Sequence, residues 1–205
     1  SIGEGRVQHR RILAGLGIAL ALGTSLVPLG AMAGTVSVVD PAERAAVAVP
    51  GSEAGVMRGW VQLVWNPLSR TLERIAYTAW DPIPSLGLEM QWLPDDPAAH
   101  SSGAITGTGT LTFRKPGAAS YDPSANVAQY RGAMVGGRFE GDGEFVDGAG
   151  FSYSGVWRSG LMDGEGRLML ANGDEYVGFF RDGLRDGDGI FTTASGFVYR
   201  GGFTA

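Results

Sequence analysis

Three pairs of acidic residues recur in the second half of this 205-residue chain, and each pair flanks a glycine. The pairs are Glu140 with Asp142, Asp163 with Glu165, and Asp186 with Asp188. Two neighbouring carboxylates could hydrolyse a glycosidic bond, ligate a divalent cation or bind a basic partner. An active site is normally one constellation, whereas these acids recur in equivalent positions. We therefore expect no catalytic residue and no enzyme activity.

Three interpretations of the six acids remain: a solvated acidic surface, a site for a basic protein partner, or a cation site. The segments "GDGEF" and "RDGDGIF" resemble calcium-binding loops, but such loops repeat every nine residues or so and the period here is longer. We expect calcium not to bind. The six acids are our candidates for binding a protein partner.

Other chemistry-bearing residues are few. Asp95, Asp96 and His100 lie in one proline-containing stretch, and the only other histidine is His9. A lone histidine beside two aspartates is more often at the surface than in a metal site. The chain has no cysteine, so thiolate metal sites and disulfides are excluded. We expect neither a metal nor a cofactor.

The charge balance also excludes a class of partner. The formal net charge is −5 and the isoelectric point is about 5.0. Binding to nucleic acid needs clustered Lys and Arg against the phosphates. We expect no nucleic-acid partner.

The acids are carried by a repeat of 23 residues. Residues 130–152, 153–175 and 176–198 align without a gap, and 199–205 begin a fourth unit. Each unit starts Tyr-x-Gly-x-apolar, has a glycine at its eighth position and has Gly-x-Gly at its twelfth to fourteenth. The expected core residues are the first and fifth of each unit: Tyr130, Met134, Tyr153, Trp157, Tyr176, Phe180, Tyr199 and Phe203.

The spacing predicts one β-hairpin per repeat. Positions one, three and five share one face of a strand, and the glycine between two large side chains leaves room for a neighbouring ring. The glycine at position eight suits a hairpin turn with positive φ. A single hairpin has too little core of its own, so stacked hairpins must share one.

This pattern resembles the MORN repeat (membrane occupation and recognition nexus). The resemblance covers Tyr130 to the chain end and implies an all-β fold, a single-layer twisted array of stacked β-hairpins, described as a β-solenoid or extended antiparallel sheet. It implies a non-enzymatic protein scaffold, sometimes dimeric, for which binding of lipid headgroups has also been proposed. The acids at positions eleven and thirteen depart from the family, where these positions are commonly basic or neutral.

The charge of the array disfavours an anionic lipid as its ligand. Residues 130–205 contain seven Arg against eleven Asp or Glu. Binding to a lipid surface needs several cations together. Arg158, Arg181 and Arg185 could still form a local basic patch.

The N-terminal segment has the features of an export signal. Arg6, Arg10 and Arg11 precede an uncharged, mostly apolar run over residues 12–30, and Ala31 and Ala33 have the spacing that a signal peptidase recognises. The run is also long enough to cross a bilayer uncleaved. We prefer a retained transmembrane helix over residues 12–30 to a signal peptide over 1–33. The arginines would stay in the cytoplasm, and all that follows would be outside it.

Between this segment and the array, residues 34–55 predict a flexible linker. Residues 56–129 predict a β-rich region in which residues 88–93 and 107–113 form a degenerate repeat. Trp60, Trp65, Trp80 and Trp92 are expected in the core or on a strand face of that β-layer.

Two functions are consistent with this sequence. The first is a membrane-tethered scaffold or accessory subunit of a membrane protein complex, located in a bacterial inner membrane with its C-terminal domain in the periplasm, and binding a protein partner. The second is a secreted module, cleaved after Ala33, that binds lipid headgroups or an envelope polymer.

Overall fold

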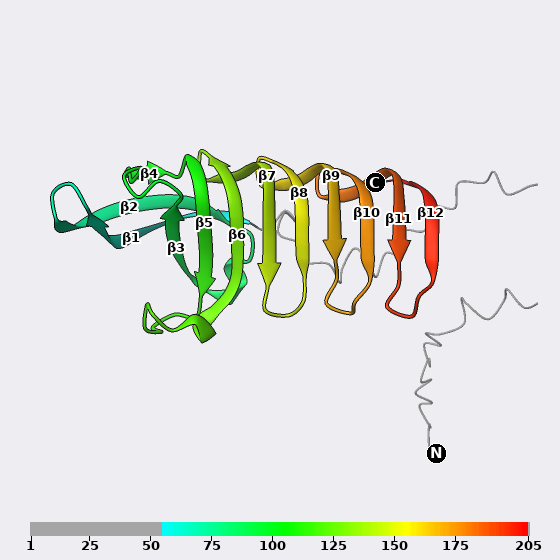
Figure 1. Cartoon of the computed structure of the whole chain (residues 1–205), viewed down its shortest axis with the longest axis horizontal. Coiled ribbons are helices and arrows are strands. Elements are labelled where there is room, and N and C mark those ends of the chain that lie inside the picture. Colours follow the sequence, from blue (N-terminus) through cyan, green and yellow to red (C-terminus); the bar gives the residue numbers. More distant parts are fainter. Residues whose placement is uncertain (1–54, 205) are drawn as a thin grey trace, which may run out of the picture. The chain divides into compact units, whose positions relative to one another are not determined.

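The computed structural model describes residues 55–204 (Figure 1). The predicted signal or anchor segment and the predicted linker up to residue 54 lie outside the described residues. Within residues 55–204, no helix has the length and apolar character needed to cross a membrane.

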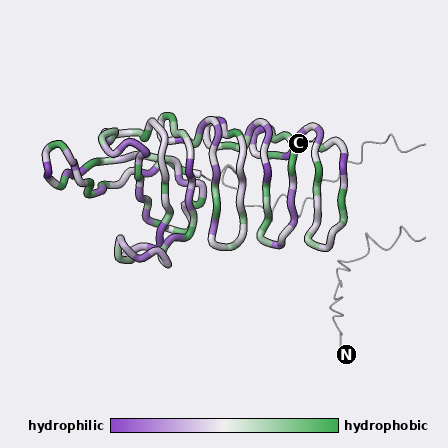
Figure 2. The backbone as a smooth tube through the Cα atoms, in the orientation of Figure 1, coloured by the Kyte–Doolittle hydropathy of each residue, from purple (hydrophilic) through white to green (hydrophobic). Residues whose placement is uncertain are grey.

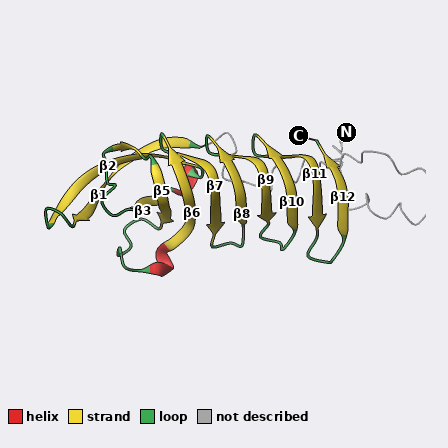
Figure 3. Cartoon of the chain, turned by 45° about the horizontal axis from the view of Figure 1, so that its top comes forward, coloured by secondary structure: helices red, strands yellow, loops and turns green. Residues whose placement is uncertain are grey.

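The described residues form twelve strands and two short 3₁₀ turns, so the region is all-β (Figures 1 and 3). The elements are β1 (Val56–Asn66), β2 (Thr71–Asp81), η2 (Pro84–Leu86), β3 (Glu89–Pro94), β4 (Gly103–Ala104), β5 (Gly107–Arg114), η3 (Pro123–Ala125), β6 (Asn126–Val135), β7 (Arg138–Asp147), β8 (Ser152–Arg158), β9 (Leu161–Met169), β10 (Glu175–Arg181), β11 (Leu184–Thr192) and β12 (Val198–Phe203).

Nine of these strands form one open antiparallel sheet. Its order is β12-β11-β10-β9-β8-β7-β6-β5-β3, so neighbours in the sequence are neighbours in the sheet. Strands β1, β2 and β4 form a separate three-stranded sheet, in which β4 is parallel to β2. The extended antiparallel sheet was expected from the repeat; the second sheet was not.

Each repeat contributes one hairpin to the nine-stranded sheet. The hairpins are β6–β7, β8–β9 and β10–β11, and β12 starts the fourth unit. Their two-residue turns are Gly136–Gly137, Ser159–Gly160 and Asp182–Gly183, and all six residues have positive φ. Positive φ at both positions is the signature of the type I′ turn, whose twist matches that of the flanking strands. This explains the glycine at position eight.

The inner face of the sheet carries the shared core. The glycines at positions three and fourteen lie opposite each other, for example Gly155 and Gly166, and the Tyr153 ring covers both. A Cβ on Gly166 would lie 2.5 Å from the Tyr153 ring, so no larger residue fits. The same arrangement recurs with Tyr130 over Gly132 and Gly143 and with Tyr176 over Gly178 and Gly189.

The tyrosine hydroxyl has a structural function of its own. It donates a hydrogen bond to the carbonyl oxygen three residues ahead: Tyr130 to Ala133 (2.8 Å), Tyr153 to Val156 (3.0 Å), Tyr176 to Phe179 (3.0 Å) and Tyr199 to Gly202 (3.2 Å). Each bond spans the glycine at position three. A phenylalanine would fill the same space but leave that carbonyl without this partner, which explains why the first position is tyrosine.

Aromatic contacts then run from repeat to repeat. Tyr153 packs edge-on against Phe180 of the next repeat, with ring centroids 5.1 Å apart, and Tyr176 packs against Phe203 at 4.8 Å. Of the eight core residues expected from the sequence, seven are buried and Tyr199, on the last strand, is half-buried.

Strands β3 and β5 extend the same pattern toward the N-terminus. They pair antiparallel, with Trp92 opposite Leu111. The Trp92 ring lies over Gly109, where a Cβ would be 2.7 Å from it, just as the tyrosines lie over their glycines. Trp92 therefore stands where the later repeats have tyrosine.

The β1–β2 hairpin packs against the first strands of the nine-stranded sheet. The Trp80 backbone N–H donates to the Gly137 carbonyl (2.8 Å), and its ring packs edge-on against Phe139. The Gln62 carboxamide both donates to the Trp92 carbonyl and accepts from the Trp92 N–H, each at 2.9 Å. Gln62 thus satisfies backbone groups on β3, the edge strand of the sheet.

The four tryptophans expected in the core or on a strand face differ in their environments. Trp80 and Trp92 are buried and Trp60 is half-buried, but Trp65 is 56% exposed. Of the two positions expected for these tryptophans, core or strand face, Trp65 has the second. Side chains alternate along β1, and the odd-numbered ones from Gly59 to Trp65 are exposed, whereas the even-numbered ones are at least half-buried.

Candidate functional site

The six candidate acids separate into two groups by burial. Those at position eleven, Glu140, Asp163 and Asp186, are half-buried. Those at position thirteen, Asp142, Glu165 and Asp188, are exposed. The positive-φ glycine between the two acids lies where the hairpin pairing shifts register. The two groups therefore have different surroundings, although they are equally acidic in the sequence.

Two of the position-eleven acids, Glu140 and Asp163, interact with hairpin turns. Glu140 Oε2 accepts a hydrogen bond from the Ser159 backbone N–H at 2.8 Å, and Asp163 Oδ2 lies 3.5 Å from the Asp182 N–H. Ser159 and Asp182 are the first turn residues of the next repeat. The fold thus uses an acid at this position to join one repeat to the next, a role that was not predicted from the sequence. No sequence signal pointed to this role, because the separation of 19 residues between acid and turn follows from the repeat period alone.

Two of the position-eleven acids also form ion pairs. Arg158 lies 3.1 Å from Asp163, and Arg181 lies 2.9 Å from Asp186. In both pairs the arginine is mostly exposed, so the pair is screened by water and adds little to stability. These contacts place a positive charge beside Asp163 and beside Asp186.

The position-thirteen acids form a row on the outer face, the face opposite the tyrosines. Asp142 lies opposite Val156, Glu165 opposite Phe179, and Asp188 opposite Gly202. Strands are about 4.8 Å apart and each repeat adds two, so successive acids recur about every 10 Å. Among the described residues no ion pair involves them. We call Asp142, Glu165 and Asp188 the outer acidic row.

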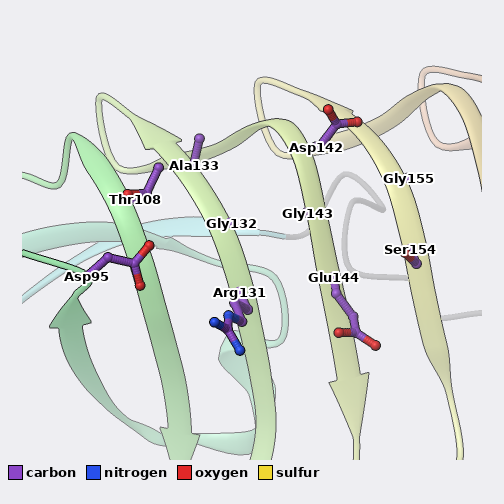
Figure 4. A pocket seen from close by; sticks show the side chains of 10 residues that line it. All are labelled: Asp95, Thr108, Arg131, Gly132, Ala133, Asp142, Gly143, Glu144, Ser154 and Gly155. Carbon is purple, nitrogen blue, oxygen red and sulfur yellow. The ribbon is translucent and has the colours of Figure 1, made fainter.

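An open depression of about 630 Å³ lies at the N-terminal end of this row (Figure 4). Its charged lining residues are Asp95, Arg131, Asp142 and Glu144, and the backbone of Gly132, Gly143 and Gly155 forms much of its floor. Three carboxylates against one guanidinium make the depression negative. Its charge suits a basic side chain from a partner.

The three arginines considered as a basic patch do not act together. Arg158 and Arg181 pair with acids of their own repeats. Arg185 instead faces the core, with its guanidinium 5.5 Å from the centre of the Tyr176 ring and 5.2 Å from that of Phe191. The array therefore lacks the local cationic patch that the sequence left open.

The loop trio of Asp95, Asp96 and His100 is also dispersed. His100 Nδ1 is hydrogen-bonded to the Tyr77 hydroxyl at 2.6 Å, whereas Asp95 lines the depression and Asp96 accepts from the Ala98 N–H. In residues 55–204, no three potential ligands among His, Asp and Glu converge on a possible metal position.

The MORN repeat family model matches residues 153–175 and 176–198. These are the second and third of the 23-residue segments, so two MORN repeats are present at 153–198. No curated protein sequence matches the chain. Tyr153, Tyr176 and the acids Asp163, Glu165, Asp186 and Asp188 lie inside the matched repeats, whereas Glu140 and Asp142 precede them.

Proposed function

We propose that this protein is a non-enzymatic scaffold that binds a basic protein partner with the outer face of its repeat array. The observation that carries the proposal is the outer acidic row. Three exposed carboxylates recur at equal intervals, and the hairpin turns do not use them. MORN repeats commonly take part in protein or membrane binding, so this fold is better suited to providing a binding surface than to catalysing a reaction.

The neighbours of the row support a protein rather than a simple cation as its ligand. Val156 and Phe179 lie directly opposite Asp142 and Glu165, and Phe179 is 47% exposed. Exposed apolar and charged groups side by side are typical of a protein interface, where an apolar centre adds to charged contacts. A partner with basic residues spaced by about 10 Å around apolar ones would complement this face.

The cellular setting belongs to the proposal as well. The arginines and the apolar run of residues 6–30 support a protein exported through the cytoplasmic membrane and held there, with residues 55–204 outside the cytoplasm as part of a membrane protein complex. Intact mass of the chain extracted from membranes tests this part. A mass that lacks residues 1–33 would favour a secreted protein instead.

The partner surface is tested by removing the charge of the row without changing its shape. In the triple variant Asp142→Asn, Glu165→Gln and Asp188→Asn, we expect proteins that co-purify with the wild type in mild detergent to be lost. The readout is quantitative co-purification from membranes, because a membrane partner is expected.

A matched control adds the same net charge away from the row. Ala149→Lys, Ala171→Lys and Ser195→Lys change exposed loop residues and raise the charge by the same three units. This control should retain the partner. Loss in both variants would show a response to net charge alone, and retention in both would rule out the outer acidic row as the binding surface.

A further inference from the structure

The free end of the β1–β2 hairpin projects beyond the sheet at the left of Figure 1 and carries several exposed apolar side chains. Leu68, in the turn, is 85% exposed. Trp65 and Leu72 lie opposite each other on the two strands. Leu63, two residues before Trp65, lies on the same face of the hairpin. We call Leu63, Trp65, Leu68 and Leu72 the hairpin tip. Figure 2 shows hydrophobic and hydrophilic residues side by side along this loop.

Backbone N–H groups of the turn are hydrogen-bonded within the hairpin itself. Asn66 Oδ1 accepts from the N–H groups of Leu68 (2.9 Å) and Ser69 (3.2 Å), and the Asn66 carbonyl accepts from the Arg70 N–H (2.9 Å). The strands themselves are paired along their whole length, from Val56 opposite Asp81 to Asn66 opposite Thr71. Backbone groups that are already hydrogen-bonded cost less to move out of water, so the paired turn lowers the cost of placing the hairpin end in a membrane interface.

Glu73, the acidic residue beside the tip, also has its hydrogen-bond partners within the hairpin. Glu73 Oε1 accepts from the Asn66 side-chain amide at 2.8 Å and from the Ser69 hydroxyl at 3.0 Å. Two exposed cations, Arg70 and Arg74, lie beside the apolar side chains, and neither forms an ion pair with another described residue. The tip is therefore apolar and positive, whereas residues 130–205 are acidic.

We propose that the hairpin tip inserts into the interface of a membrane that contains anionic lipids. A tryptophan, three leucines and two arginines at one end of the hairpin match the three zones of that interface. Leucine enters the acyl boundary, tryptophan prefers the headgroup level, and arginine binds lipid phosphate. A second copy of this chain fits less well, because two tips would bring their arginines together. The proposal does not depend on the outer acidic row, which lies on β7, β9 and β11.

The absence of cysteine makes the tip directly testable in the full chain. Leu68→Cys introduces a single thiol for an environment-sensitive fluorophore, and Ser195→Cys, in an exposed turn of the array, is the matched control. The labelled chain is reconstituted in phosphatidylcholine vesicles with or without about one third phosphatidylglycerol. A quencher attached to the lipid acyl chains then reports insertion.

We expect acyl-chain quenching at position 68 in the anionic vesicles and none at position 195. Arg70→Gln with Arg74→Gln should weaken insertion by roughly twenty-five-fold, since each cation near an anionic surface contributes about fivefold. Because the label reports its own depth, attachment of the chain through residues 12–30 cannot imitate this result.

Three outcomes would overturn the inference. The first is no acyl-chain quenching at position 68 in anionic vesicles. The second is quenching of equal strength with phosphatidylcholine alone or after both arginine substitutions. The third is shielding of the label without lipid, rising with protein concentration, which would identify a second copy as the occupant.

Discussion

Each repeat of the array depends on one tyrosine that lies across two glycines. The ring needs bare backbone beneath it, and its hydroxyl needs the carbonyl three residues ahead. Both requirements arise because, on the inner face of the sheet, only the tyrosine ring covers these glycines. Replacing the tyrosine or one of its glycines should therefore lower the free energy of unfolding, and the loss should be larger where the ring lies closer to the backbone.

Gly155→Ala tests this fit. The new Cβ would lie 2.5 Å from the Glu165 carbonyl oxygen and 2.6 Å from the Gly166 Cα, and this backbone cannot easily move aside. We expect a loss of about 1–3 kcal/mol in the free energy of unfolding, measured by urea denaturation. Gly202→Ala is the control, because no atom would lie within 4 Å of the new Cβ and the φ of Gly202 is not positive. Equal effects at the two positions would contradict the tyrosine–glycine fit.

The buried tyrosines also predict a loss of stability at high pH. Burial raises the pKa of Tyr176 to about 12 and raises the pKa of Tyr130 and Tyr153 as well. An unfolded tyrosine has a pKa of about 10, so the unfolded chain releases its proton first. The stabilising contribution is therefore complete below about pH 10 and is lost as the pH rises toward about 12.

Melting followed by circular dichroism should show this loss above about pH 10. Tyr176→Phe should reduce the slope of melting temperature against pH in that range, because one titrating group is removed. The chain has a single lysine, Lys115, so few other groups interfere. A melting temperature that stays constant to about pH 11.5, with tyrosinate absorbance unchanged, would contradict the prediction.

Among the strands, the two acids of each repeat act on different elements. The position-eleven acid of one hairpin accepts from the turn of the next, whereas the position-thirteen acid faces outward from the same strand. A backbone hydrogen bond reinforces the first contact, since the Gly160 N–H donates to the Phe139 carbonyl and the Gly183 N–H to the Met162 carbonyl. Neighbouring hairpins are thus joined at their turns as well as along their strands.

Glu140→Ala and Asp142→Ala separate these two roles. The first variant frees the Ser159 N–H, so we expect a loss of about 1 kcal/mol in unfolding free energy and faster hydrogen exchange at the Ser159 amide. The second variant removes an exposed carboxylate and should change neither the unfolding free energy nor the exchange rate of the Ser159 amide. If both variants behaved alike, the division of the acids into turn-binding and outward-facing groups would be wrong.

For the molecule as a whole, the spacing of the outer acidic row decides which ligands it can bind. Calcium takes six to eight oxygen ligands at about 2.3–2.6 Å, but successive acids of the row are about 10 Å apart. We expect millimolar calcium to leave the melting temperature unchanged. A rise of several degrees would contradict this and revive a cation site. The protein with the three amide substitutions at positions 142, 165 and 188 is the control, since it lacks the row.

The repeat could be predicted in detail from the sequence, because it is a local pattern. Tyr153, Gly155 and Trp157 already showed the shared strand face, and Gly160 showed the turn. The function of Asp163 could not be read this way. Its partner, the Asp182 N–H, belongs to the next hairpin, and the sequence contains no sign of whether a carboxylate faces a turn or the solvent.

The N-terminal hairpin marks the limit of sequence reasoning most clearly. Which face of β1 is covered depends on contacts with a strand distant in the sequence, such as the contact of Gln62 with the Trp92 backbone. Trp60 and Trp65 lie on the same strand, yet one is half-buried and the other exposed. Residue spacing by itself determined the hairpin repeat, its turns and its acidic charge. Only the tertiary structure decided which acids serve the fold and which side of the first hairpin remains open, because both depend on contacts between residues far apart in the chain.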